Sequence, residues 1–164
     1  MYRTLAAAAA LSLLGACGTS EAPAPAPTDT ATVAPTPTPT PTFDAKLPNE
    51  TVADPQALLD YWKQAVEAGE REAARRAWRK EVRAGGMAPR WEVLANPVVT
   101  FGEGRQEGAA GSLYYEVPVT VMGSNADGAG QSLTGKMVLR RVNGVDGATP
   151  EQLSWRIERI EWEG

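Results

Sequence analysis

The sequence predicts an α+β domain in which two to three N-terminal helices pack on a curved antiparallel four-stranded sheet. Apolar residues recur at the helical period before Pro97 and alternate at the strand period after it. Glycine-rich turns separate these runs. The chain has 164 residues, of which 43% are hydrophobic and 22% charged. We therefore expect one globular domain, spanning residues 45–164, with a single core.

The first predicted helix lies between Pro55 and Gly69. Asp54 supplies an N-cap, Pro55 suits the first helical position and Gly69 suits the C-terminal stop. The apolar residues of this segment fall on one helical stripe: Leu58, Tyr61, Trp62, Ala65 and Val66.

Residues 70–83 predict a second helix, which Gly85 and Gly86 end. Ala73, Ala74, Ala77 and Trp78 share one face of it, and charged residues occupy the other. A further short helical turn is expected to hold Trp91 and Leu94 before Pro97.

Residues 98–101 and 113–122 predict the first two strands, and residues 102–104 predict a bulge or a bend between them. Five residues alternate on one face of the second strand: Leu113, Tyr115, Val117, Val119 and Val121. Pro118 has no amide hydrogen, so its nitrogen must face a sheet edge or point away from a partner strand.

Residues 133–142 predict the third strand, with Leu133, Met137 and Leu139 facing inward. Residues 149–152 have the cap chemistry of a single helical turn. In the last strand, residues 153–162, the apolar pattern slips by one position, which predicts a β-bulge near Glu158 and Arg159.

Residues 1–16 carry Arg3, an apolar run and two small residues, and therefore predict a secretory signal peptide too short to cross a bilayer. The tetrapeptide Leu14-Gly15-Ala16-Cys17 resembles the bacterial lipobox. This resemblance implies cleavage before Cys17 and a diacylglyceryl group on its thiol. In a host with two membranes, Gly18 in place of Asp then implies delivery to the outer membrane rather than retention at the inner one. The alternative is an ordinary cleaved signal followed by an incidental cysteine.

Residues 17–44 predict a lipidated cysteine followed by a tether. Residues 18–44 hold 7 Pro, 8 Thr and 5 Ala and show no apolar periodicity. Repeated proline favours an extended, solvated chain. Such a segment would hold the domain away from the membrane, or it would serve as a spacer whose exact length matters little.

The order and patterning of residues 52–163 are similar to the nuclear-transport-factor-2-like superfamily. The residues that carry this resemblance are Tyr61-Trp62-Lys63-Gln64-Ala65, Gly69, Ala73-Ala74-Arg75-Arg76-Ala77-Trp78 and Tyr114-Tyr115-Glu116-Val117-Pro118-Val119. The resemblance implies a cone with an apolar pocket, and dimers through the exposed sheet face in some members. The residues expected to line that pocket, or simply to fill a core, are Tyr61, Trp62, Trp78, Phe101, Tyr115 and Met137.

Catalysis in the pocket is the alternative function. Isomerases of the superfamily use a pocket carboxylate with tyrosine, which would assign Asp60 and Tyr61 an acid–base role here. The chain has no histidine, so the superfamily's Asp-His dehydratase pair cannot form, nor can Ser-His-Asp or Cys-His sites. Glu116 alternates away from the predicted inner face.

The net charge is −4, which argues against nucleic acid as the main partner. Residues 70–83 carry a net charge of +3, with six basic against three acidic residues. This strip suggests weak binding to anionic lipid or glycan, or else a solvated face with local pairs such as Glu72 with Arg75 or Arg76. Residues 125–128 lack the remaining ligands of a calcium loop, and residues 102–108 lack dinucleotide-binding spacing. No metal or cofactor is expected.

The sequence therefore predicts a lipid-anchored envelope protein that acts as a non-catalytic binding or assembly module. The expected location is the outer membrane, facing the periplasm. The expected partners are the membrane, through the lipid, and an envelope protein or a small apolar ligand. Because a tether raises local concentration, permanent anchoring suits such a module.

Overall fold

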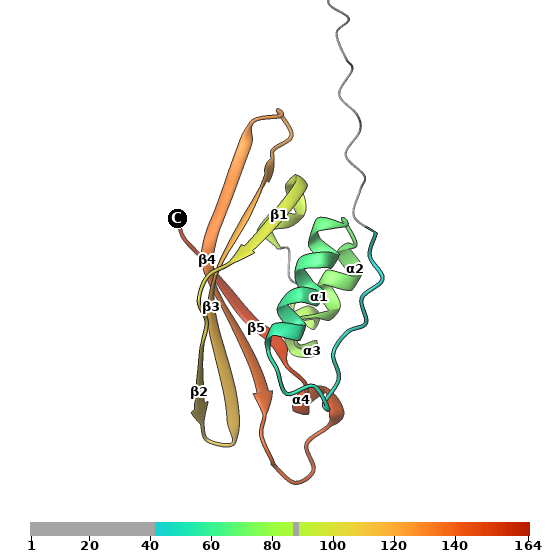
Figure 1. The fold of residues 1–164 in the computed structure, drawn as a ribbon, viewed down its shortest axis with the longest axis vertical. Coiled ribbons are helices and arrows are strands. Elements are labelled where there is room, and N and C mark those ends of the chain that lie inside the picture. The colour runs from blue at the N-terminus through green and yellow to red at the C-terminus, as the bar shows by residue number, and fades with distance from the viewer. Residues whose placement is uncertain (1–41, 87–88) are drawn as a thin grey trace, which may run out of the picture. The chain divides into compact units, whose positions relative to one another are not determined.

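The predicted α+β arrangement is confirmed by a computed structural model, which describes residues 42–86 and 89–164. The predictions for residues 1–41, including the signal peptide, Cys17 and most of the tether, lie outside the described residues. Helices α1 (Gln56–Glu67), α2 (Arg71–Arg76) and α3 (Lys80–Ala84) lie on one side of an antiparallel sheet (Figure 1).

Helix α1 forms where the sequence predicts it. The amide of Gln56 donates to Asp54 Oδ1 at 2.9 Å, and Gly69 adopts a φ of 73° directly beyond the helix. The five apolar residues expected on its inner face are all buried. Preceding the helix, the ring of Phe43 packs edge-on against Tyr61, with the centroids 5.5 Å apart.

The single helix expected over residues 70–83 is wrong, because the chain leaves the helical path between α2 and α3. Trp78 there forms an isolated parallel bridge with Ile157. The amide of Ile157 donates to the Ala77 carbonyl at 2.9 Å, and the amide of Arg79 donates to the Ile157 carbonyl at 3.1 Å. The expected short turn is confirmed as a 3-10 helix, η1 (Arg90–Val93), with Trp91 buried.

The sheet contains one strand more than the sequence predicts. Its strands are β1 (Ala95–Phe101), β2 (Arg105–Ala109), β3 (Ser112–Ser124), β4 (Gly130–Val142) and β5 (Arg156–Trp162). The order is β1-β3-β4-β5, and β2 pairs with β3 beyond the end of β1. A short helix, α4 (Pro150–Leu153), precedes β5 and starts with a complete capping box between Thr149 and Gln152.

Pro118 lies in the central strand β3, at the point where its missing amide hydrogen costs nothing. The bend at residues 102–104 interrupts the neighbouring edge between β1 and β2. The Pro118 carbonyl accepts from the Gly102 amide at 3.0 Å, so the Pro118 nitrogen faces the same interruption. This matches the expectation that the nitrogen points away from a paired strand.

The predicted bulge is confirmed in β5. Val138 pairs with Arg159, whereas the next residue, Leu139, pairs with Ile157. Glu158 is therefore the extra residue. The slip brings Ile160 and Trp162 back towards the core beside Ile157, and it bends the strand.

Side chains of α1 cover part of the free edge of β1. Glu67 Oε1 accepts the amide of Val99 at 2.8 Å, and the Lys63 ammonium donates to the carbonyl of Val99 and to Glu67. At the opposite edge of the sheet, the Trp78 bridge occupies the backbone of Ile157. These contacts satisfy groups that an open edge would otherwise expose to another strand.

Candidate functional site

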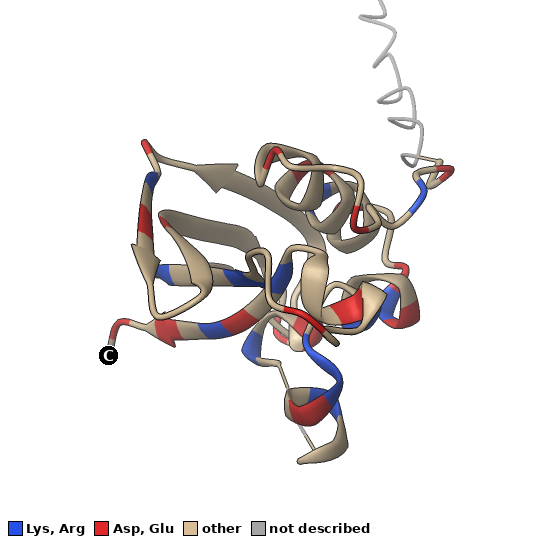
Figure 2. Ribbon diagram, turned by 90° about the horizontal axis from the view of Figure 1, so that it is seen from below, with Lys and Arg blue, Asp and Glu red and all other residues tan. Residues whose placement is uncertain are grey.

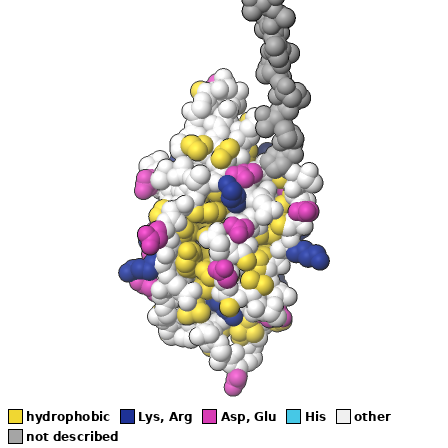
Figure 3. Space-filling view, viewed as in Figure 1, with side chains coloured by type: hydrophobic (Ala, Val, Ile, Leu, Met, Phe, Trp, Pro, Cys, Tyr) yellow, Lys and Arg dark blue, Asp and Glu magenta, His cyan; other side chains and the backbone are white. Residues whose placement is uncertain are grey.

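The six side chains expected to line an apolar pocket lie in or against the hydrophobic core. Tyr61, Trp62, Trp78 and Met137 are buried members of the core, and Phe101 and Tyr115 are partly buried against it. None of them lines any of five surface pockets in the described part of the chain. Figure 3 shows hydrophobic side chains gathered between the sheet and α1, with charged side chains around them. An apolar ligand site among these residues stays a prediction.

Asp60 and Tyr61, the alternative acid–base pair, have separate surroundings. Asp60 is exposed and accepts a hydrogen bond from the Gln56 side chain at 2.8 Å. Tyr61 is buried, and its hydroxyl donates to the Ala73 carbonyl at 3.0 Å. The tyrosine hydroxyl is thus committed to a backbone contact within the helical layer.

A strongly charged concave site lies elsewhere, between α3, α4 and the adjoining ends of β4 and β5. It is a cleft of about 350 Å³. Five cationic side chains and two carboxylates line it, which gives a net charge of +3. We call this site the arginine cleft; its charged residues are Arg79, Lys80, Arg140, Arg141, Arg156, Glu81 and Glu151.

The strand register places Arg140 beside Arg156 at this end of the sheet, and Arg141 follows Arg140 along β4. Arg141 follows Met137 and Leu139 on the inward face of β4, at the position where that face leaves the core. Arg140 points to the opposite face and is the register partner of Arg156, the first residue of β5. An arginine in the inward alternation of a strand is the sequence signal that could have indicated this site.

Two of these guanidinium groups are held by neutral neighbours. Arg140 donates from Nε and Nη2 to the Ser112 hydroxyl at 3.2 and 3.1 Å, and it lies 5.6 Å from the centre of the Tyr114 ring. Arg141 lies 5.9 Å from the centre of the Trp155 ring, and its Nε is buried without a hydrogen-bond partner among the described residues. Contacts of this kind orient a guanidinium while leaving its charge uncompensated.

Arg156 is the most buried of the three, with 8% of its surface exposed. Its Nη1 donates to the carbonyls of Pro48 at 3.0 Å and Trp155 at 2.6 Å. Burial lowers the pKa of this guanidinium below its usual value, because a low-dielectric environment disfavours the charged form. In the described part of the chain, Arg140, Arg141 and Arg156 form no ion pair with a carboxylate.

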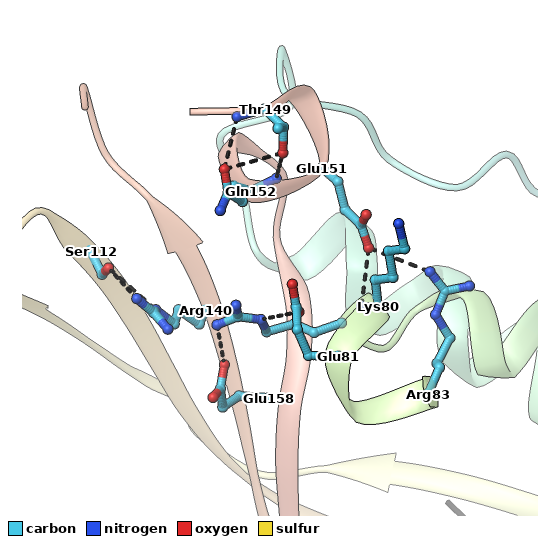
Figure 4. Close-up of polar contacts among 10 residues, drawn as sticks. Lys80, Glu81, Arg83, Ser112, Arg140, Thr149, Glu151, Gln152 and Glu158 are labelled. Atoms are coloured by element: carbon cyan, nitrogen blue, oxygen red, sulfur yellow. Dashed lines mark hydrogen bonds and ion pairs between the residues drawn. The ribbon is translucent and has the colours of Figure 1, made fainter. Parts of the chain in front are cut away.

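The carboxylates of the cleft are already engaged. Glu151 of α4 accepts from the Lys80 amide at 3.1 Å and from Arg83 at 3.4 Å, and Figure 4 shows it reaching from α4 towards both residues. Glu81 pairs with Arg79 at 3.3 Å, and Arg79 also pairs with Glu158 at 2.7 Å. The same view shows Arg140 directed towards Ser112.

Three of the six basic residues in the strip of residues 70–83 pair with carboxylates: Arg75, Arg79 and Arg83. Arg75 contacts Glu92 at 2.7 Å and Glu72 at 3.2 Å, which confirms the local pair expected with Glu72. Figure 2 shows basic and acidic positions interleaved along the helices and strands. Binding of this strip to anionic lipid stays a prediction.

The arginine cleft has the chemistry of an anion-binding site. Guanidinium groups bind carboxylates and phosphates through charge-assisted, often paired hydrogen bonds. Within residues 42–86 and 89–164, no cluster of three metal-binding side chains occurs. No helix of the described residues is long and apolar enough to span a bilayer.

The fold and the cleft define the chain as an α+β domain with a cationic surface site. A scan of protein-family models and a search of curated protein sequences each find no match. Among solved structures, the chain is similar to a nuclear transport factor 2 (NTF2-like) superfamily protein from Salmonella enterica subsp. enterica serovar Typhimurium str. LT2. The two share 8% identity with a TM-score of 0.46, over 65% of this chain and 85% of that chain. This likeness concerns the fold alone.

Proposed function

We propose that the chain is a lipid-anchored envelope protein of the nuclear-transport-factor-2-like type, and that it acts as a non-catalytic binding module through the arginine cleft. The observation that carries the proposal is the meeting of Arg140, Arg141 and Arg156 in one cleft without a carboxylate partner among the described residues. Keeping a buried charge unpaired costs free energy. An anionic ligand would offset that cost.

The sequence supports the anchored location. Leu14-Gly15-Ala16-Cys17 resembles a lipobox, and the tether of 27 residues after Cys17 would span up to about 80 Å when extended as polyproline II. Lipid on Cys17 would keep the domain at the outer membrane, facing the periplasm. The tether would then let the cleft search for a partner at high effective concentration.

The cleft favours an anionic partner over the small apolar ligand considered from the sequence. Its cations outnumber its carboxylates by three, and long-range attraction by such a cleft raises association rates with anions. A component of the envelope that presents negative charge, free or on a protein, fits this site.

Crosslinking in cells tests both parts of the proposal. A photoreactive amino acid replaces Lys80, an exposed residue in the cleft, and in a matched control it replaces Gln106, an exposed residue of β2. We expect an adduct from position 80 that is lost in Arg141→Gln, and no such adduct from position 106. Cys17→Ser should release the chain from the membrane fraction.

Two results would contradict the proposal. Equal adducts from both positions, unaffected by Arg141→Gln, would show that the cleft is not the binding site. A Cys17→Ser chain that still fractionates with membranes would remove the lipid anchor from the account.

A further inference from the structure

We infer that the arginine cleft binds a phosphate monoester in its doubly charged form. The inference rests on the proposed function, because it names the ligand of the same cleft. It starts from the charges that the protein itself leaves uncompensated.

The charge balance of the cleft calls for more than one negative charge. The charges of Arg79 and Lys80 balance those of Glu81 and Glu158, and Arg83 balances Glu151, with which it pairs. Three guanidinium charges then remain, those of Arg140, Arg141 and Arg156. A carboxylate would compensate one of them. A phosphate monoester carries about −1.5 to −2 at pH 7 and offers three terminal oxygens.

The donors are oriented before a ligand arrives. Ser112 and Tyr114 fix Arg140, and the Trp155 ring fixes Arg141. The Nε of Arg141 is buried and has no partner among the described residues. Arg156 donates from Nη1 to two carbonyls, and its other nitrogens make no hydrogen bond to the described residues. Arg140 Nη1 likewise makes no hydrogen bond within the described residues. Several guanidinium donors suit the three oxygens of a phosphate better than the two of a carboxylate.

The size of the cleft limits the rest of the ligand. At about 350 Å³, it lies at the small end of the usual range for ligand sites. The group that carries the phosphate should therefore be small and polar, as in a sugar phosphate or the headgroup of phosphatidic acid. These two sources share the monoester chemistry and are separated below.

Calorimetric titration of the full chain in detergent tests the ligand class. The probes are glucose 6-phosphate, sulfate and acetate, each at pH 5.0 and 7.5. The doubly charged phosphate rises from about a tenth to nearly all of the monoester over this interval, because its second pKa is about 6. We expect glucose 6-phosphate to bind about tenfold more tightly at pH 7.5, and acetate to bind more weakly than either dianion.

Sulfate controls for titration of the protein, because it is a dianion at both pH values. The charged groups that face the ligand are Arg79, Lys80, Glu81, Arg140, Arg141, Glu151 and Arg156, and any titration among them would change sulfate binding too. A tenfold change confined to glucose 6-phosphate supports the inference. Acetate binding as tightly as glucose 6-phosphate, or no detectable binding of the phosphate, would overturn it.

Variants locate the site. Arg141→Gln and Arg156→Lys should each weaken glucose 6-phosphate binding at least tenfold, whereas Arg105→Gln should leave it unchanged, because Arg105 lies outside the cleft and pairs with Glu107. Circular dichroism establishes that each variant is folded. If Arg156→Lys does not fold, Arg141→Gln carries the test. Equal affinities for Arg141→Gln and Arg105→Gln would overturn the assignment.

Vesicles distinguish the two sources of the monoester. The Cys17→Ser chain, which lacks the proposed lipid anchor, is sedimented with vesicles containing phosphatidic acid or, as a diester control, phosphatidylglycerol. Retention on phosphatidic acid alone assigns a lipid headgroup, and glucose 6-phosphate binding without retention assigns a soluble ester. Equal retention on both lipids would contradict monoester recognition. If monoester binding fails while the Lys80-position adduct still depends on Arg141, the proposed function stands without this ligand.

Discussion

The contact of Glu67 with the edge of β1 gives a quantitative prediction for stability. Val99 is fully buried, and its amide donates to Glu67 Oε1 at 2.8 Å. Glu67→Ala removes this acceptor and also the partner of Lys63. A buried donor left without a partner costs about 1 to 3 kcal/mol, and the partly exposed ion pair adds at most about 1 kcal/mol. We expect Glu67→Ala to destabilise the fold by about 2 to 3 kcal/mol.

Two matched variants separate the hydrogen bond from the charge. Glu67→Gln keeps an oxygen acceptor for the Val99 amide and should lose only about 1 kcal/mol. Glu107→Ala removes the carboxylate of an exposed pair with Arg105, whose side chains are 53% and 75% exposed, and should change stability by less than about 0.5 kcal/mol.

Urea unfolding of the full chain, followed by tryptophan fluorescence, measures these differences. The expected order of destabilisation is Glu67→Ala, then Glu67→Gln, then Glu107→Ala, with the slope against urea unchanged. If Glu67→Ala and Glu107→Ala unfold at the same urea concentration, the contact with Val99 does not stabilise the edge of the sheet and the reasoning is refuted.

Three further predictions concern the sheet and the first helix. Gly135→Ala should destabilise the fold by about 1 to 3 kcal/mol, because the added carbon would lie 2.6 Å from the Glu161 carbonyl oxygen. The control is Gly130→Ala, whose added carbon meets nothing within 4 Å. Similar melting temperatures for the two variants would contradict this prediction. The hydrogen bond from Arg159 lowers the pKa of Glu161, so the ionised carboxylate stabilises the fold above its unfolded-state pKa and this contribution is lost as the pH falls through the folded-state pKa. The free energy of unfolding in urea should therefore differ between Glu161→Gln and wild type at pH 7 but not at about pH 2. A difference of the same size at both pH values would refute the assignment. Asp60→Asn should leave the Lys80-position adduct intact, since Asp60 is exposed and outside the cleft; loss of that adduct would argue for a role at the site.

Local sequence patterns predicted the parts of the fold that depend on neighbouring residues. Asp54 and Gly69 bound α1 because capping and a positive φ are local requirements. The slipped alternation around Glu158 predicted the bulge, because strand residues must return to one buried face.

Contacts between distant segments account for what the sequence analysis missed. The helix expected over residues 70–83 breaks at Trp78 because that backbone pairs with Ile157, far along the chain. Strand β2 is exposed at every position and has no apolar alternation, so only its pairing with β3 creates it.

The arginine cleft was missed for the same reason. Residues 140–152 carry no recognised motif, and the cleft forms only when β4, α4, β5 and α3 meet. Arg141 was the available signal, because it continues the inward alternation of Met137 and Leu139. The search for a site instead followed the aromatic residues, which lie in or against the core.

Nuclear magnetic resonance of the arginine side chains tests most directly whether the cleft is the binding site. The Nε–H signals of the full chain are recorded in detergent while glucose 6-phosphate is added, and they are assigned with single Arg→Lys variants. The account predicts saturable shifts for Arg141 and Arg156, with Arg105 and Arg159 unchanged. Uniform shifts across all arginines, or shifts confined to residues outside the cleft, would contradict it.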